Sequence, residues 1–536
     1  MAQQQDQQGA GRFPRVYKTS LIIGLSELCE RVAYYGIVSN MALFTTSHCF
    51  PNLYHHEPST FTYVFTGFAY VLTIVGGWLA DAVLSRFWTI LGSLGVYIVG
   101  TVFLILSSYF CAHDEPPTDS RVPVSLYLTG LCLVAVGTGG SKSNLGLYGA
   151  GQYGEYCENL NHQLKAYFHW YYWCINVGGA IAVLGVAYLQ EVHTLYGYVV
   201  ICIAVFLSGV VFVIGKRWYE PDEEKEEVLG IVAGILRASG RAQRPVQRAP
   251  GGCMERWLDR AKESRASEEV DDVKQLFSLL WIFLCLILYF TLYSQMRTTF
   301  LFQSQRLRLP KFGGTQGMDG VFLNVFNAAT VLLMIPIMHW LVYPWMARMG
   351  RELTSLERMG IGMLLSVGSI VAAALVEVYR RQLVQEGHYV TQHISKHTVQ
   401  AADMTVFVQI PQFLLSGMSE VMTMVTGYYF AYTQAPLRAR GTVMGLLLLM
   451  WGLGSYASLG LSALFNAISY QMTGKRWFPL ELNDGRAEWF FIFLAVFMLL
   501  DTVFFVFLAQ RYGYKTYRQR RLLADIGTAA ERSVPT

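Results

Sequence analysis

Long apolar stretches recur from one end of the 536-residue chain to the other, and polar or charged segments separate them. Each stretch is long enough to cross the hydrocarbon layer of a membrane as a helix, which takes about 20 residues. The pattern predicts about twelve membrane-spanning helices in two groups of six. The predicted spans are residues 17–46, 60–84, 88–111, 124–150, 162–189 and 194–217, followed by 276–304, 320–346, 354–379, 404–433, 440–470 and 488–512.

The composition is typical of an all-α membrane protein. Of all residues, 53% are hydrophobic and only 15% are charged. Charge gathers between the two groups of spans and at both ends, so we divide the chain into two tails, two six-helix bundles and a linker. The divisions are an N-terminal tail at 1–16, an N-terminal bundle at 17–217, a linker at 218–274, a C-terminal bundle at 275–512 and a C-terminal tail at 513–536.

The linker carries an acidic run at 222–227 and a basic stretch at 237–248. Such a composition is typical of a cytoplasmic and partly disordered segment. Residues 254–265 place Trp257 and Leu258 among basic side chains, which would suit a short helix on the membrane surface. A solvated charged helix is the stronger alternative for this segment.

Lysine and arginine in the short loops indicate the orientation. Most of them fall on the side that holds both termini, and an excess of positive charge marks the cytoplasmic side of a membrane protein. We therefore expect both termini in the cytoplasm. The residues on which this depends are Arg12, Arg15, Lys18, Arg86, Arg348, Arg351, Arg358, Arg438 and Arg440.

The first span is interrupted near its middle by Glu27, Glu30 and Arg31, and Tyr34 and Tyr35 follow at once. On a helix, Glu27 and Arg31 are four residues apart, as are Glu30 and Tyr34, so these polar groups share one stripe. Because charge inside a bilayer is costly, it usually marks a functional site. A static ion-pair lock within the first helix is the structural alternative.

The sequence indicates neither a catalytic centre nor a metal site. It contains no P-loop, CxxC, HExxH or clustered His/Cys pattern. Of the nine cysteines, only Cys49 and Cys111 fall in predicted non-cytoplasmic loops, where these two can form one disulfide. We therefore expect a protein that is not an enzyme, that needs no metal or cofactor, and that binds no nucleic acid.

Most of the eleven histidines fall on the predicted non-cytoplasmic side. Because histidine changes charge between about pH 5 and 8, we hypothesise that this side faces an acidic compartment, with chance composition as the alternative. For His169 and His339, which lie within spans, interior packing is favoured over a proton relay. The histidines of the loops are His48, His55, His56, His113, His193, His388, His393 and His397.

Residues 27–36 resemble the ExxER(F)xYYG signature of the proton-coupled oligopeptide transporter family, a branch of the major facilitator superfamily. Further stretches resemble motifs of this family in order and spacing, outside the linker and the tails. A narrower set resembles its peptide/histidine transporter subgroup. The family-wide stretches are 70–81, 137–142, 168–178, 327–336, 419–421 and 435–436, and those of the subgroup are 293–299, 303–304, 307–310 and 410–412.

The resemblance implies a major facilitator fold, in which two six-helix bundles surround a central cavity and work by alternating access. It also implies proton-coupled symport of di- and tripeptides, with free histidine as a further candidate cargo and protons, not ATP, as the driving species. The subgroup implies an endosomal or lysosomal membrane ahead of the plasma membrane. Two alternatives stay open: transport of another small organic solute, and a membrane scaffold or transceptor that recruits a cytoplasmic signalling adaptor.

The resemblance also assigns residues to the substrate. A peptide is a zwitterion, so a site near the bilayer midplane should offer fixed charges of both signs. Arg31 and Lys142 would hold the carboxylate, and Glu420 the amine. Arg31 suits this role because its planar fork donates two parallel hydrogen bonds and stays charged when dehydrated. Asn176 and Asn327 would bind the peptide backbone between the charged ends.

Aromatic side chains are expected to line pockets for the varied side chains of the substrate. The candidates are Tyr34, Tyr35, Tyr70 and Trp170. Aromatic walls bury much apolar surface without demanding one substrate shape.

The family implies proton coupling through Glu27, Glu30 and Arg31. Loss of water favours a protonated carboxyl group and a nearby cation favours the carboxylate, so this trio could load and release a proton as its surroundings change. Gating would follow from a salt bridge between Lys142 of the first bundle and Glu420 of the second, which substrate or proton would break.

Three positions depart from the pattern of the family. Ser294 stands where many members carry an acidic residue on the seventh helix. Val38 replaces an arginine that follows the tyrosine pair in several peptide carriers, and Gly151 replaces an acidic residue after the fourth helix. These departures put in doubt a proton-transfer step on the seventh helix. They also put in doubt tight coupling between proton and substrate transport.

Overall fold

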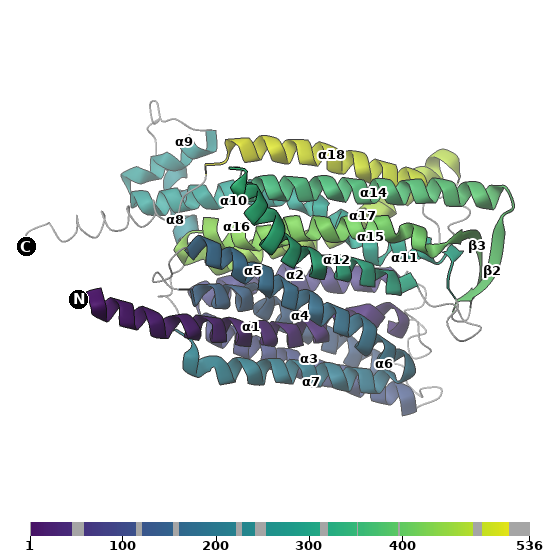
Figure 1. Ribbon diagram of the computed structural model, residues 1–536, viewed down its shortest axis with the longest axis horizontal. Coiled ribbons are helices and arrows are strands. Elements are labelled where there is room, and N and C mark those ends of the chain that lie inside the picture. Colours follow the sequence, from purple (N-terminus) through teal and green to yellow (C-terminus); the bar gives the residue numbers. More distant parts are fainter. Residues whose placement is uncertain are drawn as a thin grey trace, which may run out of the picture.

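Figure 1 shows a bundle of long, roughly parallel and antiparallel helices with a small sheet at one end. The computed structural model describes residues 2–45, 58–113, 121–153, 160–220, 228–241, 253–310, 320–350, 352–394, 397–474 and 485–513. One end of the bundle holds the start of α1 (Ala2–Thr45), the end of α18 (Ala487–Arg511) and the helices α8 (Val228–Arg241) and α9 (Cys253–Asp259). The sheet lies at the other end (Figure 1).

The first half of the chain crosses the bundle six times. Its spans begin and end within a few residues of the predicted ones, apart from the longer start of the first. The elements are α1 (Ala2–Thr45), α2 (Pro58–Ala82), α3 (Arg86–His113), α4 (Arg121–Gly151), α5 (Leu160–Ile181) continued by the π-helix η1 (Ala182–Val186) and α6 (Ala187–Val192), and α7 (Thr194–Gly215) followed by η2 (Lys216–Trp218).

The second half is more interrupted, because several of its helices contain short π or 3-10 turns. The elements are α10 (Ser267–Ser294), η4 (Gln295–Arg297) and α11 (Thr299–Ser304); η5 (Gly320–Leu323), α12 (Asn324–Ile337), η6 (Met338–Val342) and α13 (Tyr343–Arg348); α14 (Ser355–Gln385); η7 (Val406–Gln409), α15 (Ile410–Glu420), η8 (Val421–Val425) and α16 (Thr426–Gln434); η9 (Leu437–Ala439) and α17 (Arg440–Thr473); and α18 (Ala487–Arg511).

Among the described residues, ten helical stretches are long and apolar enough to span a membrane. They correspond to ten of the predicted spans. The two remaining predictions correspond to α1 and to the unit of α15, η8 and α16, which are helical but carry the charged side chains of the site described below. The chain is therefore a multi-pass helical membrane protein.

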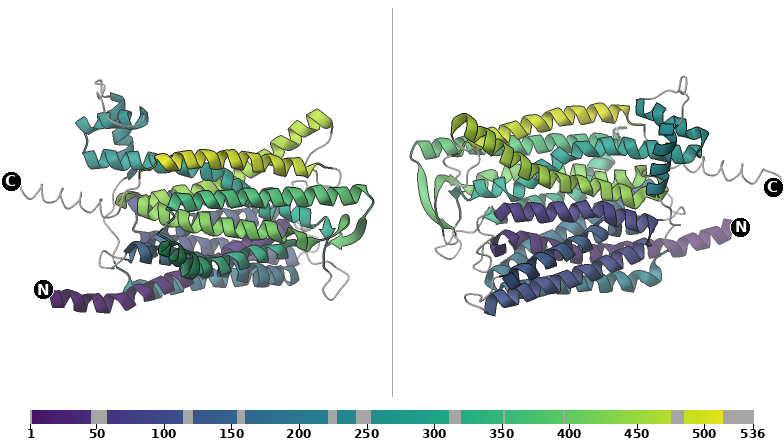
Figure 2. Two further views of the ribbon diagram at one scale, coloured as in Figure 1. Left: turned by 45° about the horizontal axis from the view of Figure 1, so that its top comes forward. Right: turned by 180° about the vertical axis from the view of Figure 1, so that it is seen from behind.

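The two halves meet along α2 and α17, which lie side by side (Figure 2). Glycines permit this approach, because a Cβ atom on Gly77 would overlap the carbonyl group of Gly441. At the end of the seam, Asp81 accepts hydrogen bonds from the backbone nitrogens of Gly441 (3.2 Å) and Thr442 (2.7 Å) and forms an ion pair with Arg86 (3.2 Å). A carboxylate thus caps the first turn of α17, where it interacts favourably with the helix dipole.

The linker forms α8 (Val228–Arg241), α9 (Cys253–Asp259) and η3 (Arg260–Glu263). These helices share a small hydrophobic core with the start of α10, in which Leu258 and Ile235 are fully buried. Leu258 therefore packs against the linker's own helices, while the charged side chains of residues 262–265 are exposed, so this segment buries one apolar face and leaves its charged face in solvent. The acidic and basic runs of the linker lie largely outside the described residues.

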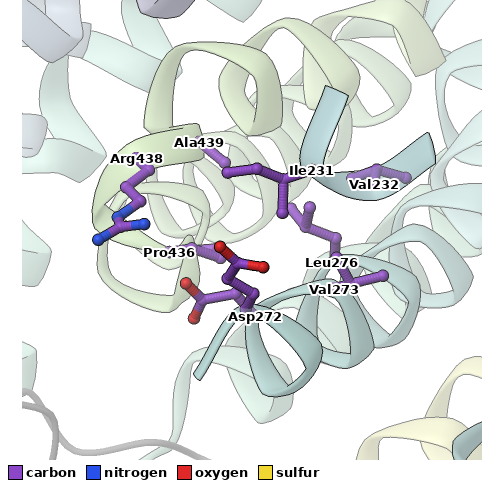
Figure 3. A pocket seen from close by; sticks show the side chains of 9 residues that line it. Ile231, Val232, Asp272, Val273, Leu276, Pro436, Arg438 and Ala439 are labelled. Carbon is purple, nitrogen blue, oxygen red and sulfur yellow. The ribbon is translucent and has the colours of Figure 1, made fainter. Parts of the chain in front are cut away.

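Ion pairs stabilise the linker core. Asp259 contacts Lys274 at 2.5 Å and Lys262 at 3.2 Å. Burial alone would raise the pKa of Asp259, but hydrogen bonds from the two lysines outweigh it and lower the pKa below its usual value. A small pocket lies between α8, α10 and the turn η9 before α17, and its lining includes Ile231, Asp272 and Arg438 (Figure 3).

A three-stranded sheet at the opposite end was not predicted from the sequence. Strands β2 (Tyr389–Ile394) and β3 (His397–Thr405) form an antiparallel pair, with Tyr389 opposite Ala402, and the short β1 (Leu307–Arg308) runs parallel to β3. Arg308 forms an ion pair with Asp403 at 2.6 Å. The sheet joins the loop after α11 to the loop after α14.

The predicted disulfide can be followed at one of its two cysteines. Cys111 is disulfide-bonded, whereas Cys49 lies outside the described residues.

Candidate substrate and proton site

The charged stripe of α1 faces the interior of the molecule. Arg31 lies 2.9 Å from Glu27 and also contacts Glu30, and all three side chains are buried. Helix α5 closes tightly over this group, because a Cβ atom on Gly178 would lie only 2.6 Å from the carbonyl oxygen of Leu28. The four-residue spacing of Glu27 and Arg31 thus places them together on one face of α1, and both carboxylates and the cation are buried.

Lys142 projects from α4, which is buried along its second half. Its ammonium nitrogen lies 3.1 Å from the centre of the Tyr34 ring and 4.0 Å from the centre of the Tyr70 ring. The same nitrogen has no hydrogen-bond partner among the residues that the structure describes. Cation–π contacts of this kind stabilise a buried cation, but they leave its hydrogen-bond donors unused.

Glu420 is the last residue of α15, immediately before the π-helix η8. Its carboxylate accepts hydrogen bonds from Tyr172 (2.5 Å), Tyr293 (3.0 Å) and Asn327 (3.1 Å). Tyr172 belongs to α5 in the first half of the chain, so this carboxylate connects the two halves. A π-turn inside a helix is frequently found at functional sites.

The predicted salt bridge between Lys142 and Glu420 is not formed in this conformation. Lys142 lies against Tyr34 and Tyr70, while Glu420 is held by two tyrosines and an asparagine. The expected gating salt bridge between Lys142 and Glu420 therefore stays a prediction, and it concerns a different conformation of the protein.

Sequence reasoning missed Arg297, although it lies inside the stretch 293–299 that resembles the subgroup. It occupies the short turn η4 that follows α10, and its guanidinium carbon lies 5.2 Å from the centre of the Tyr35 ring. Arg297 also interacts electrostatically with Glu420 and with Lys142. It brings the cations of the site to three, which balance the three carboxylates of Glu27, Glu30 and Glu420.

Trp451 is a second residue that the sequence did not single out. Its ring stacks on Tyr70 at 4.8 Å and on Phe290 at 5.0 Å, and it meets Tyr293 edge-on at 5.1 Å. Because Tyr70 belongs to α2 and Trp451 to α17, this stack forms an aromatic wall between the halves. A small pocket beside it is lined by Thr62, Tyr63, Thr66, Tyr293, Ser294, Arg297, Thr298, Trp451 and Ser455.

Trp170 does not lie with the other predicted site residues. Its side chain is 39% exposed and packs against Trp173 and Trp340 on the outer surface. Tyr171 and Tyr172 point inward instead, because adjacent residues on a helix differ by about 100° in direction. The expectation that Trp170 lines the substrate pocket therefore finds no support in the geometry.

The remaining predicted residues have defined positions. Asn176 is half-buried and donates to the carbonyl oxygen of Tyr172, one turn earlier on α5. Asn327 donates to Glu420, as noted above. Ser294 donates to the carbonyl oxygen of Phe290 on its own helix at 2.8 Å, and Val38 is buried in the core. Neither of these two departures from the family pattern supplies a titratable group to the site.

Contacts between the halves close both ends of the site. Toward the end that holds α8 and α9, Phe168 of α5 packs against Tyr428 and Tyr432 of α16. Toward the sheet, the hydroxyl of Tyr63 on α2 is hydrogen-bonded to Thr298 and Ser458 of the second half. The charged groups between these contacts are only 0–5% exposed, apart from Arg297. This conformation keeps the site away from solvent.

No group of three or more His, Cys, Asp or Glu side chains in the described part of the chain is arranged to hold a metal ion. The site consists instead of ion pairs, aromatic rings and amide groups contributed by helices of both halves. Such an arrangement is suited to binding a small charged molecule between two bodies that move relative to each other.

Comparison with known proteins identifies the family. The model of the POT family matches residues 87–478, about 73% of the chain. Solute carrier family 15 member 3 of Rattus norvegicus is 28% identical, over 94% of this chain and 93% of that protein. Protein NRT1/PTR FAMILY 8.1 of Arabidopsis thaliana is 27% identical, over 91% of this chain and 92% of that protein.

Solved structures show the same fold. An auto-inhibited POT family peptide transporter superposes with a TM-score of 0.68 at 24% identity, covering 93% of this chain and 98% of that one. The POT family transporter PepTSo gives a TM-score of 0.68 at 22% identity, covering 92% and 98%. The predicted major facilitator fold is thereby confirmed, as is the expectation of a transporter rather than an enzyme. The chain belongs to the POT family of membrane transporters.

Proposed function

We propose that the protein is a proton-coupled symporter of di- and tripeptides that works by alternating access. The observation that carries this proposal is the balanced set of buried charges contributed by both halves of the chain. Arg31 with Glu27 and Glu30 comes from α1, Lys142 from α4, and Glu420 from α15. An interior that holds both signs of charge suits a zwitterion better than an anion or a neutral solute.

The substrate carboxylate would bind between Arg31 and Lys142. Lys142 has unused donors in this conformation, so a carboxylate can accept from it without breaking an existing hydrogen bond. The substrate amine would bind Glu420, replacing one or more of the donors from Tyr172, Tyr293 and Asn327. Because Tyr172 and Glu420 belong to different halves, substrate binding at Glu420 would change a contact that closes the site.

Proton coupling would use the carboxylates that share Arg31. Glu27 and Glu30 compete for one guanidinium, and both are buried. Protonation of either would release Arg31 for the substrate carboxylate, and return of Arg31 after substrate release would favour loss of the proton. This cycle links proton and peptide movement without a carboxylate at Ser294.

Related proteins support a peptide as the cargo. Solved structures of the same fold include an auto-inhibited POT family peptide transporter and a POT family transporter in complex with a thioalcohol-conjugated peptide. We infer that free histidine is a further cargo, that both termini face the cytoplasm, and that the protein resides in an endosomal or lysosomal membrane.

Uptake of labelled dipeptide and of labelled histidine into proteoliposomes with an imposed inward proton gradient tests the proposal. The parent protein is expected to accumulate dipeptide, and Glu420→Ala is expected to abolish this uptake. Asp501→Asn is the matched control, because Asp501 is an intramembrane carboxyl group on α18 whose partner is Cys285, outside the site. Absence of uptake of either substrate by folded parent protein would overturn the proposal in favour of another solute or of a scaffold that recruits an adaptor.

A further inference from the structure

A second cluster of polar and aromatic side chains lies where α5 meets the segment formed by α12, η6 and α13. The ring centres of His162 and His339 are 6.1 Å apart, and those of His169 and His339 are 5.8 Å apart. The ring of His169 also meets Tyr343 at 5.6 Å. These contacts connect the two halves of the chain near the end of the bundle that holds α8 and α9, because His162 lies in the first turn of α5.

Fixed positive charge adjoins these rings. The guanidinium carbon of Arg358, in the first turn of α14, lies 4.1 Å from the centre of the Tyr343 ring. Arg358 interacts electrostatically with Lys165 and with His169. The acidic group that acts on Lys165 is the exposed Glu352, and neither cation forms an ion pair with a described carboxylate. The cluster therefore carries a local excess of positive charge.

One donor of the cluster is buried without a partner. Arg358 is 93% buried, and its Nε atom has no hydrogen-bond partner within the described ranges of the chain. The Nδ1 atom of His169 is occupied by the carbonyl oxygen of Lys165 at 2.6 Å. A buried, unsatisfied donor on a cation is costly, and an anionic oxygen is the acceptor that would relieve this cost best.

The outer flank of the cluster is apolar. Trp340 is 66% exposed and meets Trp170 of the first half at 5.8 Å. Leu333, Ile337 and Leu341 continue this exposed surface along the membrane-spanning segment. Tryptophan is enriched where hydrocarbon meets headgroups, so the cluster lies at a depth suited to a lipid headgroup.

We propose that this cluster binds the phosphate headgroup of an anionic membrane phospholipid. Arg358 and Lys165 contact the phosphate oxygens, His162 and His339 border the headgroup, and the acyl chains lie along the exposed face of α12 and η6. Basic pockets between transmembrane helices bind such headgroups in other proteins. Because α5 and α12 belong to different halves, the bound lipid would stabilise the conformation in which these helices touch.

Native mass spectrometry of the purified full-length protein tests the site. Phosphatidylinositol 4-phosphate is the probe, phosphatidylcholine with the same acyl chains is the neutral control, and inositol 1,4-bisphosphate and inorganic phosphate represent a free anion. The parent should retain the anionic lipid in preference to phosphatidylcholine. Arg358→Gln and Lys165→Gln should each weaken its binding about five- to tenfold, as expected for the loss of one cation near a headgroup.

Arg217→Gln is the matched control variant. Arg217 also stacks on an aromatic ring, that of Trp218 at 3.7 Å, at the same end of the bundle but outside the cluster. The Arg217→Gln variant should bind the anionic lipid with the affinity of the parent. Equal binding by the parent, Arg358→Gln and Lys165→Gln would overturn the proposal, as would binding of inositol 1,4-bisphosphate or phosphate with the affinity of the lipid. If Arg358→Gln does not fold, Lys165→Gln and His339→Gln decide the result.

Discussion

Tyr172 of the first half donates a 2.5 Å hydrogen bond to Glu420 of the second half, and this bond crosses the interface that opens in the proposed alternating-access cycle. Tyr293 donates to the same carboxylate at 3.0 Å, but it belongs to the same half as Glu420. The two tyrosines therefore form a natural pair for comparison, since only one of them connects the halves.

Tyr172→Phe should loosen the closed conformation more than Tyr293→Phe does. Each change removes one hydrogen bond to a carboxylate, worth about 1.5–3 kcal/mol, but only the first removes a tie between the halves. Hydrogen exchange of α16, which packs against α5, reports this opening. Exchange should rise in Tyr172→Phe and stay near the parent rate in Tyr293→Phe, and equal rates in both variants would argue against a closing role for Tyr172.

Lys142→Gln should raise the KM for a dipeptide about 10- to 100-fold, because it removes a charge-assisted hydrogen bond to the substrate carboxylate. The same dipeptide with an amidated C-terminus should be much less affected. Lys216→Gln serves as the control, since Lys216 also lies near an aromatic ring, that of Phe87 at 5.2 Å, but outside the site. An equal loss for both substrates would show that Lys142 does not contact the carboxylate.

Gly77→Ala should destabilise the protein by about 1–3 kcal/mol, because the added methyl group would overlap the backbone of Gly441 and force α2 and α17 apart. Gly92→Ala on α3 meets no atom within 4 Å and should leave stability unchanged or raise it by about 0.5–1 kcal/mol. Thermal unfolding in detergent measures both. Similar midpoints for the two variants would contradict close packing along this seam.

The linker core should lose stability in acid. The pKa of Asp259 is lowered in the folded state, since hydrogen bonds from Lys274 and Lys262 outweigh the effect of burial. A lowered pKa contributes stability above the unfolded pKa of about 3.8, and this contribution disappears as pH falls through the folded value. Asp259→Asn should therefore speed hydrogen exchange in α8 at pH 7.

The difference between Asp259→Asn and the parent should shrink as the pH falls below about 4. Glu263→Gln is a suitable control, because Glu263 is an exposed carboxylate of the same linker that forms no ion pair with the described part of the chain. An effect of Asp259→Asn that does not depend on pH would exclude the ion pair as its cause.

The membrane architecture could be predicted because it follows from local sequence. Apolar runs of fixed length indicate spans, and the charges of Glu27, Glu30 and Arg31 indicate a site because a bilayer penalises them. The contact between Glu27 and Arg31 also follows from their spacing of four residues on a helix. Lys142 and Glu420 could be singled out because they lie in stretches that resemble family motifs. Their present partners could not be predicted, because these depend on how the two halves pack.

The parts that escaped prediction depend on contacts between distant segments. The sheet formed by β1, β2 and β3 joins loops about 90 residues apart, and its short strands carry little periodicity of their own. Arg297 lies in the 3-10 turn η4 that follows α10, where α-helical spacing no longer predicts the direction of a side chain. Trp170 was placed wrongly because its neighbours are inward-facing aromatic residues, and residue type alone does not reveal the direction of a side chain.

The central claim is that the carboxylates sharing Arg31 couple proton movement to peptide movement, and Glu30→Gln, which removes the more deeply buried of the two, tests it most directly. In proteoliposomes, this variant should lose accumulation of dipeptide driven by a proton gradient but retain exchange of labelled for unlabelled dipeptide without a gradient. Exchange retained with accumulation lost would place the proton step at Glu30. Accumulation equal to that of the parent would contradict the account.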